Sequence, residues 1–347
     1  MALVAKVTHQ YKILVVAPSW VGDMVMAQTL FRRLHELHAN LQLDVLAPGW
    51  TLPLLARMPE VHEAIPNPFG HGEFSLGARI KLGRSLHARA YNQAIVLPNS
   101  WKSALIPFFA GIPMRTGFIG EARWGLLNDA RKLNKSTLPL MVQRFVALAG
   151  RADSPLAPSI PGMALAVDET RRQHTLKKLN LNTNQKIAAL CVGAEFGPAK
   201  RWPPKHFAAL AQALNQEGFQ VWVVGSAKDA AAGEEVASLS LGAGINLCGQ
   251  TNLDEAVDLL ASAAVIVSND SGLMHVAAAL NKPLIALYGS SSPGFTPPMS
   301  EQARIVSLNL ACSPCFQREC PLGHLDCLEK LTPQSVLDNI HKLIAQP

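Results

Sequence analysis

The chain has 347 residues, 49% of them hydrophobic and 16% charged, a globular composition with enough apolar material for two domains of ordinary size. Its formal net charge of +6 favours acidic ligands such as nucleotide phosphates, phosphorylated lipids or an anionic membrane surface. No apolar run reaches the roughly 20 residues of a membrane-spanning helix. No long Lys/Arg run or aromatic–basic stripe is present either, so we expect no nucleic-acid partner.

Residues 1–12 contain Lys6, His9 and Lys12 and lack the continuous apolar region of a secretory signal peptide. We expect an unstructured extension here, and the sequence assigns no role to residues 1–11. Without a signal peptide, a cytoplasmic location is expected.

The first half of the chain alternates between strand and helix signals. Residues 12–18 (KILVVAP) form a β-branched run that predicts a buried strand, and residues 22–38 predict a helix. Residues 41–48 and 91–98 predict further strands, and residues 101–110 another helix. This alternation is typical of a parallel sheet covered by helices.

Residues 151–167 contain three prolines and show neither a helical nor a strand period, so we interpret them as an interdomain linker. The alternation then restarts. Strands are predicted at residues 186–193, 219–225, 264–269 and 283–289, and helices at residues 205–216, 253–263, 272–280 and 332–345. For the last helix, Thr332 is a candidate N-cap and Pro333 suits the first helical position.

The pattern as a whole predicts two doubly wound, Rossmann-like α/β domains, at residues 1–165 and 166–331, followed by a final helix at residues 332–347. In such sheets, ligands bind beyond the carboxyl ends of the strands, next to helix N-termini. The residues that follow each strand are therefore the candidates for chemistry.

The first candidate segment, P-S-W-V-G-D at residues 18–23, directly follows the first strand. Gly22 permits a tight turn, and Asp23 falls at the helix start, where the macrodipole favours a carboxylate. Asp23 is either a helix-capping residue or a base that accepts a proton from a substrate hydroxyl. The segment lacks the G-x-G-x-x-G pattern of a dinucleotide-binding turn, which argues against NAD.

The second candidate segment, G-A-E-F-G-P-A-K-R-W-P at residues 193–203, follows the first strand of the second half. Its small residues allow close approach of a ligand, and Lys200 and Arg201 supply adjacent positive charge. A solvated basic pair is the alternative. We favour a phosphate site because the pair lies in a Gly-rich loop after a strand.

Two further segments follow strands in the second half. In S-N-D-S-G-L-M-H at residues 268–275, Asp270 or Ser271 can cap the next helix, whose N-terminus suits a diphosphate. Asp270 is expected to orient sugar hydroxyls or the loop, and His275 either packs or meets the ligand. The Gly/Ser/Pro loop at residues 288–298 is either a connector or a nucleotide or sugar contact.

Four cysteines lie within 16 residues near the C-terminus: Cys312, Cys315, Cys320 and Cys327. Their number suits structural zinc, but their spacing matches no common zinc ribbon, so zinc ligands and free thiols both stay open. Cys191 and Cys248 are predicted to be small core residues. The chain contains no D-x-D sequence of the kind that commonly holds a divalent metal at sugar–nucleotide sites.

Taken together, these segments resemble glycosyltransferase family nine, and within it the ADP-heptose:lipopolysaccharide heptosyltransferases of type II. The resemblance covers nearly the whole chain after residue 11. It rests on the segments P-S-W-V-G-D-M from residue 18, L-P-N-S at 97–100, P-F-F-A-G-I-P at 107–113, R-T-G-F at 115–118, G-L-L-N-D at 125–129, G-A-E-F-G-P-A-K-R-W-P at 193–203 and N-D-S-G-L-M-H-V-A-A-A-L at 269–280. The N-terminal tail and the cysteine segment depart from the family pattern.

The resemblance implies a GT-B fold and an inverting mechanism that needs neither metal nor cofactor. The donor would be ADP-heptose, bound by the C-terminal domain. The acceptor would be the first heptose on Kdo-lipid A, bound by the N-terminal domain. Because that acceptor is a lipid, peripheral contact with the inner face of the cytoplasmic membrane is also expected. The final helix would return to the N-terminal domain.

The expected site residues fall into three groups. Asp23 is the expected general base, and Lys200 is expected to stabilise the departing ADP. The expected donor-binding residues are Gly193, Ala194, Glu195, Phe196, Lys200, Arg201, Asp270, Ser271, Gly272, Leu273 and His275. The expected acceptor-side residues are Ser19, Trp20, Gly22, Asn99, Lys102 and Arg115.

Three other functions fit the same sequence features. A sugar–nucleotide epimerase would convert the donor without an acceptor, and a non-catalytic module would bind ADP without turnover. Within the family, heptosyltransferase I would use Kdo as its acceptor sugar.

Overall fold

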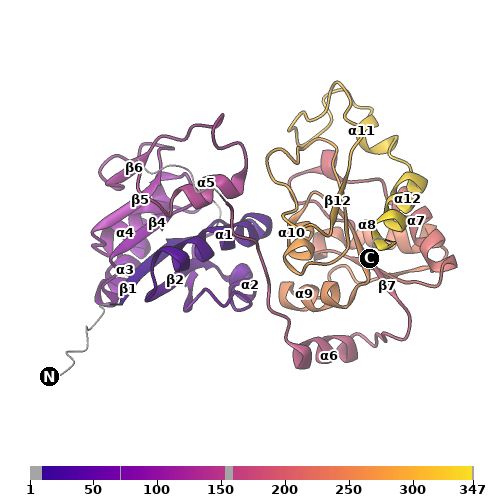
Figure 1. Cartoon of the computed structure of the whole chain (residues 1–347), viewed down its shortest axis with the longest axis horizontal. Coiled ribbons are helices and arrows are strands. Elements are labelled where there is room, and N and C mark those ends of the chain that lie inside the picture. The colour runs from indigo at the N-terminus through magenta and orange to yellow at the C-terminus, as the bar shows by residue number, and fades with distance from the viewer. Residues whose placement is uncertain (1–9, 71, 153–158, 346–347) are drawn as a thin grey trace. The chain divides into compact units, whose positions relative to one another are not determined.

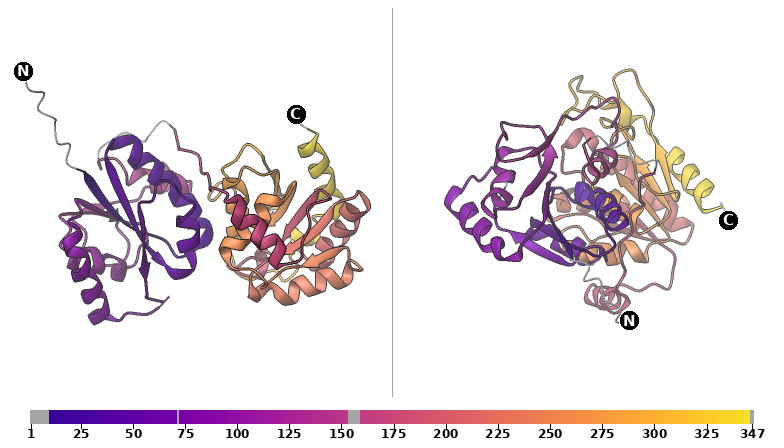
Figure 2. Two further views of the ribbon diagram at one scale, coloured as in Figure 1. Left: turned by 90° about the horizontal axis from the view of Figure 1, so that it is seen from below. Right: turned by 60° about the vertical axis from the view of Figure 1, so that its left-hand side comes forward.

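The computed structural model describes residues 10–70, 72–152 and 159–345. The expected tail at residues 1–9 and part of the proline-rich linker lie outside these residues. The chain folds as two compact units, which we call unit 1, Met1–Pro161, and unit 2, Gly162–Pro347. Each unit is a six-stranded parallel sheet with helices on both faces (Figures 1 and 2).

The sheet of unit 1 has the strand order β3-β2-β1-β4-β5-β6. Its strands are β1 (Tyr11–Val16), β2 (Leu41–Pro48), β3 (Glu63–Asn67), β4 (Gln93–Val96), β5 (Met114–Phe118) and β6 (Asp129–Arg131). Its helices are α1 (Val21–Leu37), α2 (Leu52–Leu55), α3 (Leu76–Leu86), α4 (Leu105–Phe109) and α5 (Met141–Ala147). The strand order reverses direction between β1 and β4, which is where a doubly wound fold binds ligands.

Alternation along the strands of unit 1 gives each sheet face its own core. Leu14 and Val16 of β1 lie in a cluster with Leu86 of α3 and Ile106 of α4. Helices α3 and α4 pack together over that face, and α1 packs against α5. Both faces are buried, which explains why these strands read as nearly continuous apolar runs.

The sheet of unit 2 has the strand order β12-β11-β10-β7-β8-β9 and reverses between β10 and β7. Its strands are β7 (Ile187–Cys191), β8 (Gln220–Val224), β9 (Gly244–Asn246), β10 (Val265–Asn269), β11 (Leu284–Leu287) and β12 (Ala303–Val306). Its helices are α6 (Glu169–Lys178), α7 (Pro204–Gln216), α8 (Ala230–Leu239), α9 (Leu253–Ser262), α10 (Gly272–Ala279), α11 (Asp326–Glu329) and α12 (Pro333–Ile344).

The elements that the sequence predicts agree closely with these bounds, and β2 has the same bounds in both. The predicted helix at residues 101–110 is a 3₁₀ turn, Trp101–Ala104, followed by α4. The helix at residues 332–345 begins as predicted, because Thr332 accepts a hydrogen bond from the backbone N–H of Ser335. Elements with weak local patterns, such as β3, β5, α6, α8 and β12, were not predicted.

Helix α12 packs on the core of unit 2. Its buried side chains Val336, Leu337, Ile340 and Leu343 belong to the core of unit 2. There the helix packs against α7, β11 and β12. Its single apolar stripe is therefore covered within unit 2.

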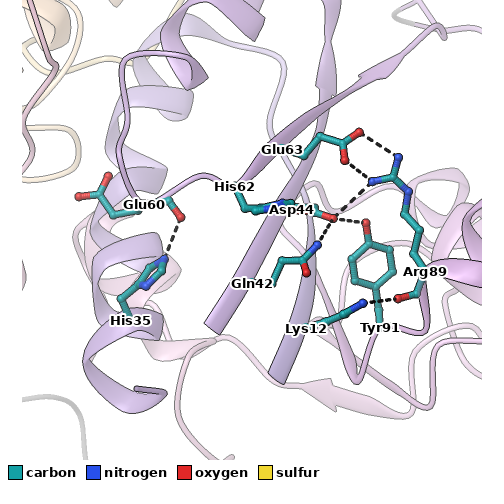
Figure 3. A network of polar contacts seen from close by, with 9 residues as sticks. All are labelled: Lys12, His35, Gln42, Asp44, Glu60, His62, Glu63, Arg89 and Tyr91. Atoms are coloured by element: carbon teal, nitrogen blue, oxygen red, sulfur yellow. Dashed lines mark hydrogen bonds and ion pairs between the residues drawn. The ribbon is translucent and has the colours of Figure 1, made fainter. Parts of the chain in front are cut away.

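A polar network joins β2, β3 and the segment before β4 in unit 1 (Figure 3). The fully buried Asp44 accepts a hydrogen bond from Tyr91 at 2.6 Å and contacts His62 Nδ1 at 2.9 Å. Both terminal nitrogens of the Arg89 guanidinium donate hydrogen bonds to the carboxylate of Glu63. Burial raises the pKa of Tyr91, and its bond to Asp44 raises it further. The network links these three segments through their side chains.

Candidate functional site

In unit 2, the loops that follow β7 and β10 meet at the point where the strand order reverses. Asn269, the last residue of β10, donates to the backbone carbonyl of Val192 at 2.8 Å and accepts from the backbone N–H of Trp202 at 3.0 Å. The asparagine is completely buried. One amide side chain therefore holds both ends of the loop at residues 193–201 against β10.

Lys200 and Asp270 form the centre of this site, although 70 residues separate them in sequence. The Lys200 Nζ atom lies 2.6 Å from Asp270 Oδ2, and Asp270 is 5% exposed. The same ammonium lies 5.3 Å from the ring centroid of Phe196, a cation–π distance. The ammonium is thus held at the carboxyl edge of the sheet, where a phosphate is expected to bind.

The other predicted residues of this loop turn to different partners. Arg201 donates to the carbonyl of Ala194 at 3.3 Å and lies 3.9 Å from Asp229 Oδ1, and Glu195 pairs with Lys228. Lys200 and Arg201 were expected to act as one adjacent positive pair. Instead, each cation has its own carboxylate, because the side chains leave the loop in different directions.

Gly193 is required by close packing against a neighbouring carboxylate. A Cβ atom on Gly193 would lie 2.5 Å from Asp229 Oδ2, so any side chain there would have to displace the Asp229 carboxylate. Asp229 is held in turn by the backbone N–H and hydroxyl of Ser226. The lack of a side chain at Gly193 thus lets the backbone pack against Asp229. The sequence had suggested a second role, in which the glycine lets a ligand come close to the backbone.

Helix α10 begins beside the Lys200–Asp270 pair. Ser271 is its N-cap, and no side-chain capping bond satisfies the first N–H groups there. Gly272 and Leu273, which follow Ser271, are half-buried. The backbone N–H groups of this turn and the helix macrodipole favour negative charge.

His275 is buried in the first turn of α10, and its Nδ1 atom has no hydrogen-bond partner. Burial lowers the pKa of His275 to about 4; the charge of Lys200 lowers it further, whereas Asp270 acts in the opposite sense. The imidazole is therefore neutral at physiological pH. It is a buried polar group in the first turn of α10 whose Nδ1 atom has no hydrogen-bond partner.

The depressed pKa of His275 predicts an acid-sensitive contribution to stability. The stabilising effect of the neutral ring is complete above about pH 6.5, and is lost as the pH falls toward about 4, because only the unfolded chain binds the proton in that window. In the wild type, the free energy of unfolding should fall by about 3 kcal/mol from this histidine alone as the pH drops from about 6.5 to about 4. His275→Gln is expected to remove that part of the decline. Denaturant unfolding at a series of pH values measures this effect. The exposed His174→Gln is the matched control, and a slope equal to the wild-type slope in His275→Gln would contradict the prediction.

Ser290 and Ser291 lie in the loop at residues 288–298, which the sequence left as either a connector or a ligand contact, whereas Arg318 was not among the predicted residues. The hydroxyls of Ser290 and Ser291, in the loop after β11, are buried without hydrogen-bond partners. The Gly/Ser/Pro composition of that loop was the signal that pointed to it. The guanidinium of Arg318 lies 5.4 Å from the ring centroid of Phe196, and the Arg318 carbonyl accepts from the backbone N–H of Ala199. No local pattern could have revealed that contact.

Unit 1 has a corresponding edge after β1 and β4. Trp20 is the N-cap of α1, and Asp23 lies in the first turn of that helix, as predicted. Asp23 and Gly22 are half-buried, whereas Ser19 and Asn99 are exposed. The carboxylate therefore lies at the carboxyl end of β1, next to the reversal of strand order, in a position suited to a base.

Two predicted acceptor-side residues have different places in unit 1. Lys102 follows β4 at the same edge as Asp23, and its Nζ lies 3.4 Å from the carbonyl of Glu73. Arg115 is the second residue of β5 and donates to the carbonyls of Ile112 and Leu126. The structure thus places Arg115 near the amino end of its strand, apart from the other predicted residues.

The described residues contain one group of three metal-type ligand atoms within 4.8 Å of one another: Asp44, His62 and Glu63. It lies in the polar network of Figure 3, where Arg89 and Tyr91 already engage its carboxylates. The four cysteines of residues 312–327, all of them described, do not bring three sulfur atoms that close together. Cys191 and Cys248 are buried core residues, as predicted.

Comparison with solved structures defines the class of protein. The structure of Escherichia coli ADP-heptose lps heptosyltransferase II has a TM-score of 0.86 at 48% identity, covering 96% of this chain and 99% of that one. The two six-stranded units are accordingly those of a GT-B glycosyltransferase, as the sequence predicted.

Sequence comparisons place the chain more narrowly. The family model for glycosyltransferase family 9 (heptosyltransferase) matches residues 79–326. Lipopolysaccharide heptosyltransferase 2 of Escherichia coli K12 is 50% identical, covering 96% of this chain and 99% of that protein. Lipooligosaccharide heptosyltransferase 2 of Haemophilus influenzae is 48% identical at the same coverage. The chain belongs to glycosyltransferase family 9, the heptosyltransferases. Within the part of the chain that the structure describes, no helix is long and apolar enough to span a bilayer.

Proposed function

We propose that this glycosyltransferase moves L-glycero-D-manno-heptose from ADP-heptose to the first heptose of the lipopolysaccharide inner core, with inversion at the anomeric carbon. Whole-length similarity to proteins named heptosyltransferase 2 favours this acceptor over Kdo, the acceptor of the type I enzyme. The observation that carries the proposal is the Lys200–Asp270 pair beside the N-terminus of α10 in unit 2.

In the proposed donor site, the diphosphate binds the N-terminal turn of α10 and the ammonium of Lys200. Backbone N–H groups at Ser271 and Gly272 and the macrodipole favour the added negative charge. Asp270 holds Lys200 at 2.6 Å and leaves one carboxylate oxygen for the sugar hydroxyls. The buried hydroxyls of Ser290 and Ser291 are additional donors at the same edge of the sheet.

In the proposed reaction, the acceptor hydroxyl oxygen attacks the anomeric carbon of the donor while its proton passes to the carboxylate of Asp23. The bond between that carbon and the diphosphate oxygen breaks, and ADP leaves with the electron pair. The transition state resembles an oxocarbenium ion, as in glycoside hydrolysis. Lys200 and the N–H groups of α10 stabilise the negative charge that develops on ADP.

The proposed location is the cytoplasm, with transient contact at the inner face of the cytoplasmic membrane, where a lipid-linked acceptor lies. The net charge of +6 is compatible with an anionic lipid surface.

Mass spectrometry of acceptors after incubation with ADP-heptose tests the function. One acceptor is bare Kdo-lipid A, and the other already carries one heptose. We expect a heptose-sized mass gain on the second acceptor alone. A gain on the first alone would assign the type I activity, and conversion of the donor without any acceptor would instead indicate an epimerase.

A further inference from the structure

Large aromatic side chains gather on the loops that follow the strands of unit 1. Of the six tryptophans in the chain, Trp202 and Trp222 are buried in unit 2, whereas four in unit 1 are 38% to 74% exposed. These four are Trp20 after β1, Trp50 after β2, Trp101 after β4 and Trp124 after β5. The exposed Phe74 follows β3. Since all the strands are parallel, the five side chains lie on loops at one edge of the sheet, which we call the aromatic edge.

Neighbouring loops of the aromatic edge are tied to one another. The indole N–H of Trp50 donates to the carbonyl of Ser19, next to Trp20, at 3.1 Å. The rings of Phe74 and Trp101 lie 5.0 Å apart. These contacts join the loops after β1 and β2, and those after β3 and β4.

The loops after β4 and β5 are joined in the same way. The backbone N–H of Trp101 donates to the carboxylate of Glu121 at 3.0 Å. The buried guanidinium of Arg123, next to Trp124, donates to the carbonyl of Pro98 at 2.7 Å. The aromatic side chains are thus held on fixed loops, which lowers the entropic cost of binding a ligand.

Charge is distributed unevenly between the units. Residues 1–161 contain 17 Lys and Arg against 9 Asp and Glu, whereas residues 162–347 contain 14 against 16, giving formal charges of +8 and −2. Lys102 follows β4, and the exposed Lys132 and Lys135 follow β6, at the aromatic edge. A ligand of this edge should therefore combine apolar ring faces with negative charge.

We propose that the aromatic edge binds the saccharide part of the acceptor, with pyranose rings stacked on the indole rings and the sugar-acid carboxylates near the lysines. This inference rests on the proposed function and extends the acceptor site beyond Trp20 to Trp50, Phe74, Trp101 and Trp124. The negative face of an aromatic ring suits the C–H face of a sugar, and the indole N–H supplies a donor at the ring margin. Asp23 follows β1 at the same edge, so a sugar held there has its hydroxyls near the proposed base.

The test uses the full-length protein and a deacylated acceptor saccharide, which separates sugar binding from lipid binding. Trp101→Ala and Trp124→Ala are expected to raise the KM for the saccharide about tenfold each, as for a buried aromatic hot spot, with kcat changed less than about threefold. Trp124→Phe keeps a ring and should retain most of the affinity. Leu37→Ala is the control, because Leu37 is 52% exposed at the far end of α1.

A second readout does not require turnover. Without donor, the saccharide should change the tryptophan fluorescence of the wild type, and the dissociation constant should rise in the two alanine variants while the affinity for ADP stays the same. Unchanged saccharide affinity in both variants, or a loss confined to binding of anionic phospholipid vesicles, would overturn the inference and leave the proposed function intact. A wild type that neither binds nor glycosylates the saccharide would overturn the proposed function, and the inference with it.

Discussion

Asp23→Asn is expected to slow heptosyl transfer by about 10²–10⁴-fold, the range that general-base catalysis typically contributes. An amide keeps the size and shape of the side chain but cannot take up the proton of the acceptor hydroxyl at neutral pH. Affinity for ADP should be unchanged, because Asp23 lies in unit 1 and the proposed donor site in unit 2. Transfer rates and calorimetric titration with ADP measure the two quantities.

Glu36→Gln provides the matched control for Asp23→Asn. Glu36 is a carboxylate on the last turn of the same helix, α1, where it is 51% exposed and pairs with Arg33. It should therefore keep normal turnover. The loss of a charge near the helix N-terminus costs only about 0.3–1 kcal/mol of stability, so Asp23→Asn should stay folded. Near-normal transfer by Asp23→Asn would reject its assignment as the base.

Lys200→Ala is expected to weaken ADP binding and to slow transfer by about 10²–10³-fold, as removal of one preorganised electrostatic donor does. The ammonium is the cation that the structure places beside the N-terminus of α10 and Asp270. Calorimetry with ADP and rates with a saturating donor separate the two effects. If both values were unchanged, Lys200 would have no part in the site.

A stability effect must be separated from the chemical one, because Lys200→Ala leaves the buried carboxylate of Asp270 without its cation. Removing one partner of a buried ion pair costs about 3–5 kcal/mol. The double variant Lys200→Met with Asp270→Asn removes both charges, and it should recover stability without recovering ADP affinity. Lys205→Ala is the control, because Lys205 is 62% exposed and pairs with Glu329 in the same unit.

The proposed base and the proposed donor site both lie where the strand order of a parallel sheet reverses. In each unit the strand order reverses beside the first strand of the sheet. Asp23 lies in the segment that follows β1, and Lys200 lies in the loop that follows β7. Parallel strands leave room for ligands where neighbouring loops turn in opposite directions. This repetition places the proposed base in one unit and the proposed phosphate site in the other.

Local sequence determined the strands and helices that have strong patterns, the N-cap at Thr332 and the presence of Asp23 and Lys200 directly after strands. Those features depend on neighbours a few residues away, through side-chain period and turn chemistry. The family resemblance added the activity and the donor. Weakly patterned elements such as β3 and β12 were missed, since their short strands become stable only when paired at the sheet edges.

Tertiary structure alone decided which residues meet. It paired Lys200 with Asp270 across 70 residues, gave Arg201 a different carboxylate, and placed α12 in the core of unit 2. It also gathered aromatic side chains from five separate loops at one edge of a sheet. Strand order decides such contacts, and strand order results from burying helix and sheet faces over the whole unit, which no local window of sequence contains.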